Sequence, residues 1–212
     1  MIELIGDASA DKDTLVMAAG VELNGNGNTV TITDWTAGNG AVGVDYAIKA
    51  SQGGIIKNLT ISGGRTAIEV IQNIPATLTL ENVTAVESVR ALRVENNGMD
   101  LVVTNCTFAG KASWAPKSAL FTNTAFIKNG QVKGDIVEPY TNTVMNGCTF
   151  EDGFKMSLTD LNTYHSGQTV TLNNCYVGTT LITAANVKSL LGIEDGSFTA
   201  GELFVGTTEI AP

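Results

Sequence analysis

The 212-residue sequence is poor in charged residues, aromatic residues and proline, and it contains a single histidine. Charged side chains make up 16% of the chain, and 21 acidic residues against 12 basic ones give a formal charge of −9. Because binding to nucleic acid or to an anionic membrane surface needs clustered basic residues, and no long basic run occurs, neither partner is expected. The hydrophobic fraction of 43% argues against intrinsic disorder.

Long hydrophobic segments are also missing. No apolar stretch approaches the roughly 20 residues of a membrane-spanning helix, so membrane insertion is not predicted. The first residues have neither the basic region nor the apolar region of a signal peptide, so no signal peptide is expected in this sequence. Export of the protein is not excluded by this. The three cysteines form no C-x-x-C pair beside the lone His165. These residues do not supply a zinc site, so no metal is predicted. No phosphate-binding loop occurs, and no cofactor is predicted. The G-x-S-x-G motif of a serine nucleophile is missing as well.

What the sequence does contain is an internal repeat. Five short segments align, at residues 55–62, 78–85, 101–108, 143–150 and 170–177. Each is a run of β-favouring residues followed by an anchor, and the anchors are Asn58, Asn82, Asn105, Gly147 and Asn174. We interpret the long interval between Asn105 and Gly147 as one repeat with an insertion near residues 111–115, and we place a second insertion at residues 128–141.

The repeats favour strands over helices. Threonine, valine and isoleucine are frequent, and apolar and polar residues alternate, as in a half-buried strand. A period of this length with turns at Asn and Gly predicts a solenoid whose equivalent strands stack in parallel. We therefore expect one all-β domain over residues 1–212, with about six coils over residues 21–180. Residues 1–20 would form a cap or first strand, and residues 181–212 a C-terminal cap and tail, with a helix over residues 184–191.

Stacking places equivalent residues above one another, which predicts three contacts between repeats. The anchors Asn58, Asn82, Asn105 and Asn174 would form a ladder of paired amides. The cysteines, each one residue after an anchor, would form a buried stack of Cys106, Cys148 and Cys175, in which only Cys148 and Cys175 are placed for a disulfide. Glu69 and Arg93 share one offset and are expected to form an ion pair.

The opening LNGNGNTVTIT and the repeated N-x-T turn after each strand resemble the right-handed parallel β-helix proteins of the pectate-lyase-like superfamily. The resemblance covers residues 20–180 approximately. It implies a right-handed parallel β-helix and an extracellular or cell-surface location. It says little about activity, because the same fold serves polysaccharide lyases and hydrolases, adhesins, phage tailspikes and structural filaments.

The sequence gives little support for catalysis. The hydrolases that this chain resembles carry Asn-Thr-Asp, Asp-Asp, Gly-His-Gly and Arg-Ile-Lys motifs, and none of them is present. The lyases need acidic calcium ligands and a basic residue, for which the nearest local candidates are Glu151, Asp152 and Asp160 with Lys155. Arg65, Arg90 and Arg93 cluster on neighbouring repeats, where we expect them to be solvated. We therefore predict no catalytic residue.

Ligand binding is the more open possibility, because insertions project from a solenoid and sugars stack on aromatic rings. The candidates are Trp114 in the first insertion, Tyr140 in the second, and Tyr164 with His165 in a third irregular stretch. Trp35 and Tyr46 are expected as cap contacts.

The predicted function is a noncatalytic structural or adhesive module, with a glycan as the leading ligand. One alternative is a polysaccharide lyase or glycoside hydrolase. The other is a filament or virion subunit that self-associates through its terminal repeats or through the tail at residues 197–212, by adding a strand to a neighbouring sheet.

Overall fold

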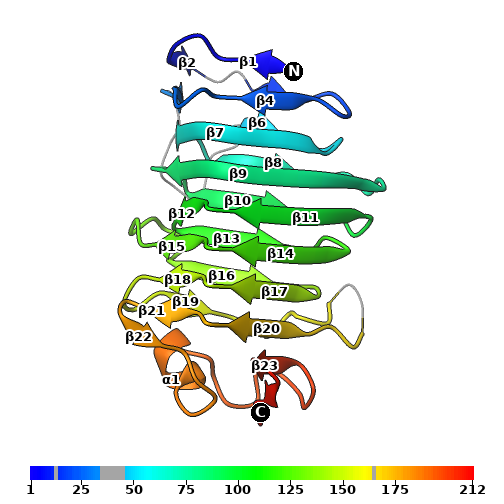
Figure 1. The fold of residues 1–212 in the computed structure, drawn as a ribbon, viewed down its shortest axis with the longest axis vertical. Helices are drawn as coiled ribbons and strands as arrows, with labels where there is room; N and C mark the ends of the chain where they lie inside the picture. Colours follow the sequence, from blue (N-terminus) through cyan, green and yellow to red (C-terminus); the bar gives the residue numbers. More distant parts are fainter. Residues whose placement is uncertain (12–13, 34–45, 164–165) are drawn as a thin grey trace.

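The structure is a computed structural model, and it describes residues 1–11, 14–33, 46–163 and 166–212. Parallel strands lie one above another along the long axis of the molecule (Figure 1). The described residues form one sheet of 17 strands and one of seven, and all strand pairings but two are parallel. The prediction of an all-β chain with parallel strands is confirmed.

The large sheet contains two ladders of parallel strands joined by a bend. The first ladder consists of β1 (Ile2–Glu3), β4 (Glu22–Asn24), β7 (Gly54–Gly63), β9 (Ala76–Val86), β11 (Met99–Thr104), β14 (Ser118–Thr122), β17 (Thr143–Asn146), β20 (Val170–Asn173) and β23 (Leu203–Val205). The second ladder passes through the later halves of β7 and β9 and adds β2 (Ala8–Ala10), β5 (Thr29–Ile32), β12 (Thr107–Ala109), β15 (Ala125–Ile127), β18 (Thr149–Phe150) and β21 (Tyr176–Val177).

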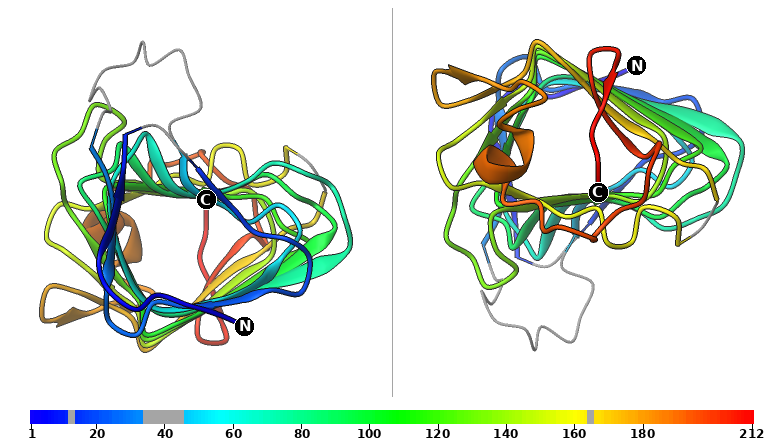
Figure 2. Two further views of the ribbon diagram at one scale, coloured as in Figure 1. Left: turned by 90° about the horizontal axis from the view of Figure 1, so that it is seen from above. Right: turned by 90° about the horizontal axis from the view of Figure 1, so that it is seen from below.

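The seven-stranded sheet is the third ladder. It consists of β3 (Leu15–Val16), β6 (Tyr46–Lys49), β8 (Thr66–Val70), β10 (Arg90–Val94), β13 (Lys111–Trp114), β16 (Ile136–Pro139) and β19 (Lys155–Met156). Seen along the long axis, the three ladders surround one interior (Figure 2), which the apolar core side chains fill.

The bend between the first and second ladders lies at a column of residues with positive φ. These residues are Asn58, Asn82, Asn105, Asn123, Gly147 and Asn174, with φ between 48° and 62°. Asparagine and glycine are the residues that adopt this left-handed conformation most readily, which explains why they recur at the anchor. A Cβ atom on Gly147 would also lie 2.7 Å from Oδ1 of Asn123, so glycine is favoured there for space as well.

The column corrects the repeat count. Asn123 is an anchor that the sequence alignment missed, so the interval from Asn105 to Gly147 holds two repeats and not one repeat with an insertion. Residues 111–114 are the strand β13, paired with β10, and not an insertion. Residues 128–141 likewise include β16, which pairs with β13. As a result, the first ladder holds seven strands within residues 21–180, from β4 to β20, where about six coils were expected.

The amide ladder is present but runs through a partly different set of residues. Nδ2 of Asn82 donates to Oδ1 of Asn58 at 2.9 Å, as predicted. Asn105 accepts from the missed anchor Asn123 at 3.5 Å. Further along, the pairing passes between the residues before the bend, because Asn173 donates to Asn146 at 2.9 Å, in place of the predicted Asn174.

The core contains the three predicted cysteines and a stack of aromatic rings. The cysteines do not form one continuous stack, because Thr124 follows the missed anchor Asn123 in the repeat between those of Cys106 and Cys148. Cys106, Cys148 and Cys175 are all buried and none is in a disulfide. Burial raises the pKa of the Cys106 thiol to about 11, so this thiol is protonated at neutral pH. Phe108, Phe126 and Phe150 occupy equivalent positions on three strands of the second ladder, with ring centroids 6.0 and 5.1 Å apart.

The C-terminal residues close one end of the stack. The predicted helix is α1 (Val187–Leu191), and Gly192 ends it in the left-handed conformation. The tail folds onto its own chain, because β23 pairs in parallel with β20 and β24 (Thr208–Glu209) pairs antiparallel with β23. A further short strand, β22 (Thr180–Leu181), pairs antiparallel with β21. The tail is therefore engaged within the chain, and its last strand, β24, pairs with β23 alone in the described residues.

Candidate binding face on the seven-stranded sheet

Side chains of the third ladder alternate between the core and the outer surface. The inward positions carry buried apolar residues, which are Ile48, Ile68, Leu92, Ala112, Val137 and Met156. One position later, paired residues form an outward column of Lys49, Glu69, Arg93, Ser113 and Glu138. Because side chains on successive strand residues point to opposite faces, the repeat gathers charged and polar groups on one side of the sheet. Of these, Glu69 and Ser113 are buried, and the others are partly exposed.

We call this surface the charged face. It comprises that column together with the neighbouring residues Tyr46, Arg65, Arg90, Glu95, Lys111 and Tyr140. It includes all three arginines of the chain. Five basic residues stand against three acidic ones here, which is the reverse of the balance over the whole sequence.

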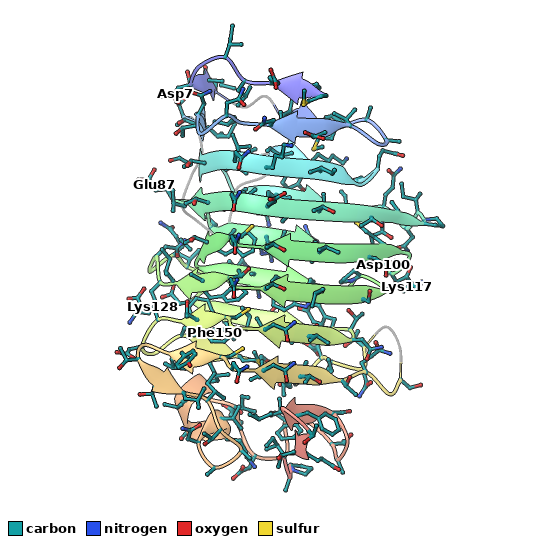
Figure 3. All side chains as sticks on the ribbon, in the orientation of Figure 1. Asp7, Glu87, Asp100, Lys117, Lys128 and Phe150 are labelled. Atoms are coloured by element: carbon teal, nitrogen blue, oxygen red, sulfur yellow. The ribbon has the colours of Figure 1, made fainter. Side chains whose placement is uncertain are left out.

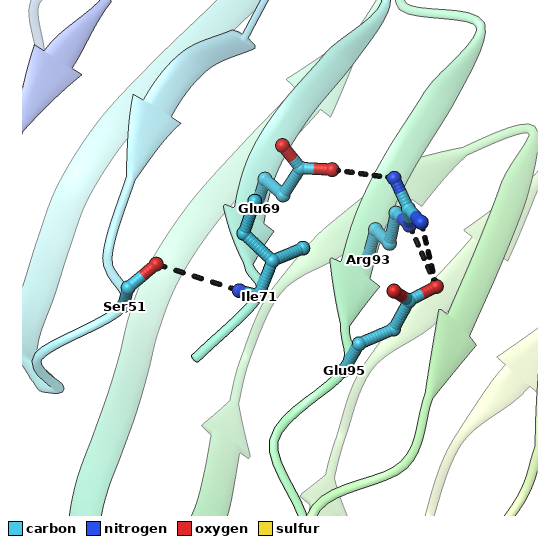
Figure 4. A network of polar contacts seen from close by, with 5 residues as sticks. All are labelled: Ser51, Glu69, Ile71, Arg93 and Glu95. Atoms are coloured by element: carbon cyan, nitrogen blue, oxygen red, sulfur yellow. Dashed lines mark hydrogen bonds and ion pairs between the residues drawn. The ribbon is translucent and has the colours of Figure 1, made fainter. Parts of the chain in front are cut away.

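Glu69 and Arg93 form the predicted ion pair, with Arg93 Nη1 2.9 Å from Glu69 Oε1 (Figure 4). Arg93 also contacts Glu95, at 2.7 Å from Nη2 to Oε1. Glu69 is 0% exposed, and this burial raises its pKa although the Tyr46 hydroxyl and Arg93 favour its ionised form. Just after β8, the backbone amide of Ile71 donates to Oγ of Ser51 at 3.4 Å.

Arg90 differs from Arg93, which pairs with two carboxylates, in its hydrogen bonding. Its Nε atom is buried and has no hydrogen-bond partner in the described part of the chain. Burial, together with the positive charges of Arg93 and Arg65, lowers the pKa of Arg90. The positive charges of Arg65, Arg90 and Arg93 act on one another here, which favours an anionic group of a ligand beside them.

The later strands of the charged face carry a second ion pair. Lys111 Nζ lies 2.6 Å from Glu138 Oε1, and the Tyr140 hydroxyl donates to Glu138 Oε2 at 2.8 Å. Tyr140 is half-buried, with its hydroxyl held in place at the edge of the face. Of the predicted sugar-binding residues, Tyr140 is therefore the one that the structure places on this surface.

Trp114 was predicted to project from an insertion, and this prediction is wrong. Trp114 is 0% exposed on β13, and its ring centroid lies 4.5 Å from that of Phe121. Its indole Nε1 donates to Oγ1 of Thr143 at 2.8 Å. Because the ring is part of the core, it cannot stack against a sugar. Tyr164, His165 and Trp35 fall outside the described residues.

The acidic candidates for lyase chemistry lie outside the strands of the third ladder, and only their basic partner Lys155 lies on that sheet. Glu151, Asp152 and Asp160 are exposed, and Glu151 Oε2 accepts a hydrogen bond from the Lys128 backbone amide at 2.8 Å. Lys155 is exposed on β19. Within the residues that the structure describes, no group of three or more His, Cys, Asp or Glu side chains is arranged to hold a metal ion.

Comparison with known proteins finds no match: no family model, no curated protein and no solved structure is similar to this chain. No helix among the described residues is long and apolar enough to cross a membrane. The function therefore has to be argued from the residues themselves.

Proposed function

We propose that the chain is a right-handed parallel β-helix that binds an acidic glycan on its charged face without transforming it. The three stacked ladders support this architecture, since each strand pairs in parallel with its equivalent one repeat later. Connections between parallel strands of one sheet are almost always right-handed, which favours that hand here. In keeping with the resemblance, we also propose that the protein acts outside the cell, as a structural or adhesive module.

The observation that carries the binding proposal is the state of Arg90. The chain has a net charge of −9, yet its three arginines lie together, and the Nε donor of Arg90 is buried without an acceptor in the described residues. Guanidinium groups bind carboxylate and sulfate oxygens with good geometry. A glycan with such groups would offset the positive charge of the three arginines, while its hydroxyls would contact Tyr140.

The positions of the acidic residues support binding without catalysis. Glycoside hydrolysis needs two carboxyl groups about 5–9.5 Å apart. Glu69 and Glu95 lie closer together, but Arg93 stands between their carboxylates and pairs with both. Glu69 and Glu138 are separated by three strand spacings, which is about 14 Å between their backbones. Both are also engaged with cations, Glu69 with Arg93 and Glu138 with Lys111.

A glycan array that includes uronic-acid, sulfated and neutral oligosaccharides tests the proposal. We expect binding to acidic glycans that weakens as salt is added, and its loss in Arg90→Met. Lys57→Met is the matched control, because Lys57 pairs with Glu22 on the first ladder, away from the charged face. Equal binding by wild type and Arg90→Met, or binding of neutral glycans alone, would contradict the proposal.

A second candidate function is self-association through the N-terminal end, and a specific observation favours it. β1, β2 and β3 each pair with a single strand in the described residues. Ile2 is 48% exposed, Val16 is 67% exposed and Ile5 is fully exposed at this edge. Because the other end is closed, we propose that a second copy docks edge to edge, giving a closed dimer and not a filament. Sedimentation over a range of concentrations tests this, and a monomer at all of them contradicts it.

A further inference from the structure

A hollow lies where the second ladder passes into the third, at the turns that follow β9 and β15. Its volume is about 430 Å³, within the range of small-molecule sites. Val86, Ala109 and Ile127 line it with apolar surface, and Glu87, Lys128 and Gln131 line it with polar groups. Figure 3 shows Glu87 and Lys128 along the same edge of the molecule.

The backbone of Glu87 has a conformation that glutamate rarely adopts. Its φ is +60°, in the left-handed region. The equivalent positions in the repeats before and after are Gly63 and Gly110, with φ of 82° and 86°, as the pairing of Ser62 with Val86 and of Phe108 with Ala85 indicates. A glutamate therefore replaces glycine at a position where glycine has no strain. Such strain in a native structure points to a role for the side chain.

The loop that forms the other wall is fixed by specific contacts. Asn129 Nδ2 donates to the carbonyl oxygens of Ser88 and Ala109, both at 2.8 Å. The backbone N–H of Asn129 donates a hydrogen bond to Oδ1 of Asp135 at 2.8 Å. A Cβ atom on Gly110 would lie 2.4 Å from the Asn129 side chain, so the glycine leaves the space that this contact needs. The hollow is thus built by side chains and is not a gap between loose segments.

We propose that this hollow binds one ring of a neutral sugar. The apolar wall of Val86, Ala109 and Ile127 matches the C–H face of a pyranose ring, and the Glu87 carboxylate and Gln131 carboxamide can accept from and donate to its hydroxyls. Lys128 balances the charge of Glu87, which favours a ligand without net charge. Ser62 Oγ, 2.5 Å from Glu87 Oε2, holds the carboxylate in place. This site is separate from the charged face, and it does not depend on the acidic-glycan proposal.

The test is a titration of the isotope-labelled full chain, followed by amide NMR, with the methyl glycosides of glucose, galactose and mannose added one at a time. We expect saturable shifts at Val86, Glu87 and Gln131 with at least one of them. Glu87→Gly should weaken this binding at least about tenfold, because a hydrogen bond to a charged group is lost. The same variant should keep or raise the melting temperature, because the backbone strain is relieved.

Gln131→Ala is a second variant that removes the other polar wall without altering the strained backbone, and it should also weaken binding. Glu81→Gln is the matched control, since Glu81 is an exposed carboxylate on β9 outside the hollow. The proposal is overturned if none of the three glycosides gives saturable shifts, or if Glu87→Gly binds as the wild type does. A lower melting temperature in Glu87→Gly would show that Glu87 serves folding and would also count against it. Arg90→Met should leave these shifts unchanged, so the two binding proposals can fail separately.

Discussion

At the C-terminal end of the stack, β23 is covered by the antiparallel strand β24, and α1 buries Val187 and Leu191 against the core. At the N-terminal end, β1, β2 and β3 have one neighbour each in the described residues, and apolar side chains such as Ile2 and Val16 are exposed. A parallel stack has an edge at each end, and an edge of unpaired strands attracts other strands. The C-terminal core is covered by α1 and β24, whereas apolar side chains of β1 and β3 are exposed, so under the proposed self-association the N-terminal end is the one we expect to pair.

The largest expected contrast comes from equivalent truncations at the two ends. Leu191 is 0% exposed, so Leu191→Ala should lower the free energy of unfolding by about 2–5 kcal/mol. Ile2→Ala should change it by less than about 0.5 kcal/mol, because Ile2 is half-exposed at an edge. Urea denaturation followed by circular dichroism measures both. Equal losses would mean that the two ends contribute alike to stability.

Substitutions of Asn82, in the middle of the stack, give a change in the free energy of unfolding with which the changes at both ends can be compared. Asn82 has a φ of 53° and its amide donates to Asn58. Asn82→Ala should lower the free energy of unfolding by about 2 kcal/mol, since alanine is strained in this conformation and the hydrogen bond is lost. Asn82→Gly also loses the hydrogen bond, but glycine adopts this backbone conformation without strain. It should therefore lower the free energy of unfolding by less than Asn82→Ala does. Thermal and urea unfolding would contradict this if glycine proved the more harmful of the two.

The buried carboxylate Glu69, which lies away from both ends, should make stability depend on pH. Burial raises its pKa, so the folded chain holds this proton more tightly than the unfolded chain. The wild type should therefore gain stability relative to Glu69→Gln as pH falls through the raised pKa towards the ordinary glutamate value, and lose it as pH rises. Denaturation midpoints of the two proteins from acidic to neutral pH measure this difference. A difference that stays constant with pH would contradict the assignment.

The smallest effect on stability is expected at the open edge. Ile5 is fully exposed, so Ile5→Lys should change the free energy of unfolding by less than about 0.5 kcal/mol. The same variant should reduce self-association, because it places a charge where two edges would meet. Analytical ultracentrifugation compares it with the wild type, and Ile55→Lys, another exposed isoleucine on the first ladder, serves as the control. Equal effects of the two substitutions would exclude the edge as the docking surface.

Sequence reasoning found the features that repeat without interruption. Asn58 and Asn82 were recognised because their flanking strands are alike, and Glu69 and Arg93 because they share one offset. Asn123 was missed although Thr122-Asn123-Thr124 resembles Thr104-Asn105-Cys106, because this repeat is only 18 residues long. That error moved Trp114 from a strand into an insertion.

The composition of the binding surfaces depends on register, which the sequence alone did not give. Lys111 and Glu138 join the charged face only when β13 and β16 are aligned with β10. Glu87 gave no sequence signal, since its left-handed backbone becomes visible only beside the glycines of the neighbouring repeats. Local residue preferences therefore predicted the strands and the turns. The shortened repeat prevented a correct alignment of β13 and β16, so the residues that these strands add to the charged face were not predicted.

The most direct test of this account is amide hydrogen exchange of the monomeric chain, measured at a concentration where no dimer forms. The structure predicts slow exchange in β20 and β23, comparable to that in the middle of the stack, because these strands are covered by the C-terminal elements. It predicts fast exchange in β1, β2 and β3. Equal protection at the two ends, or faster exchange in β23 than in β1, would contradict a stack with one closed and one open end.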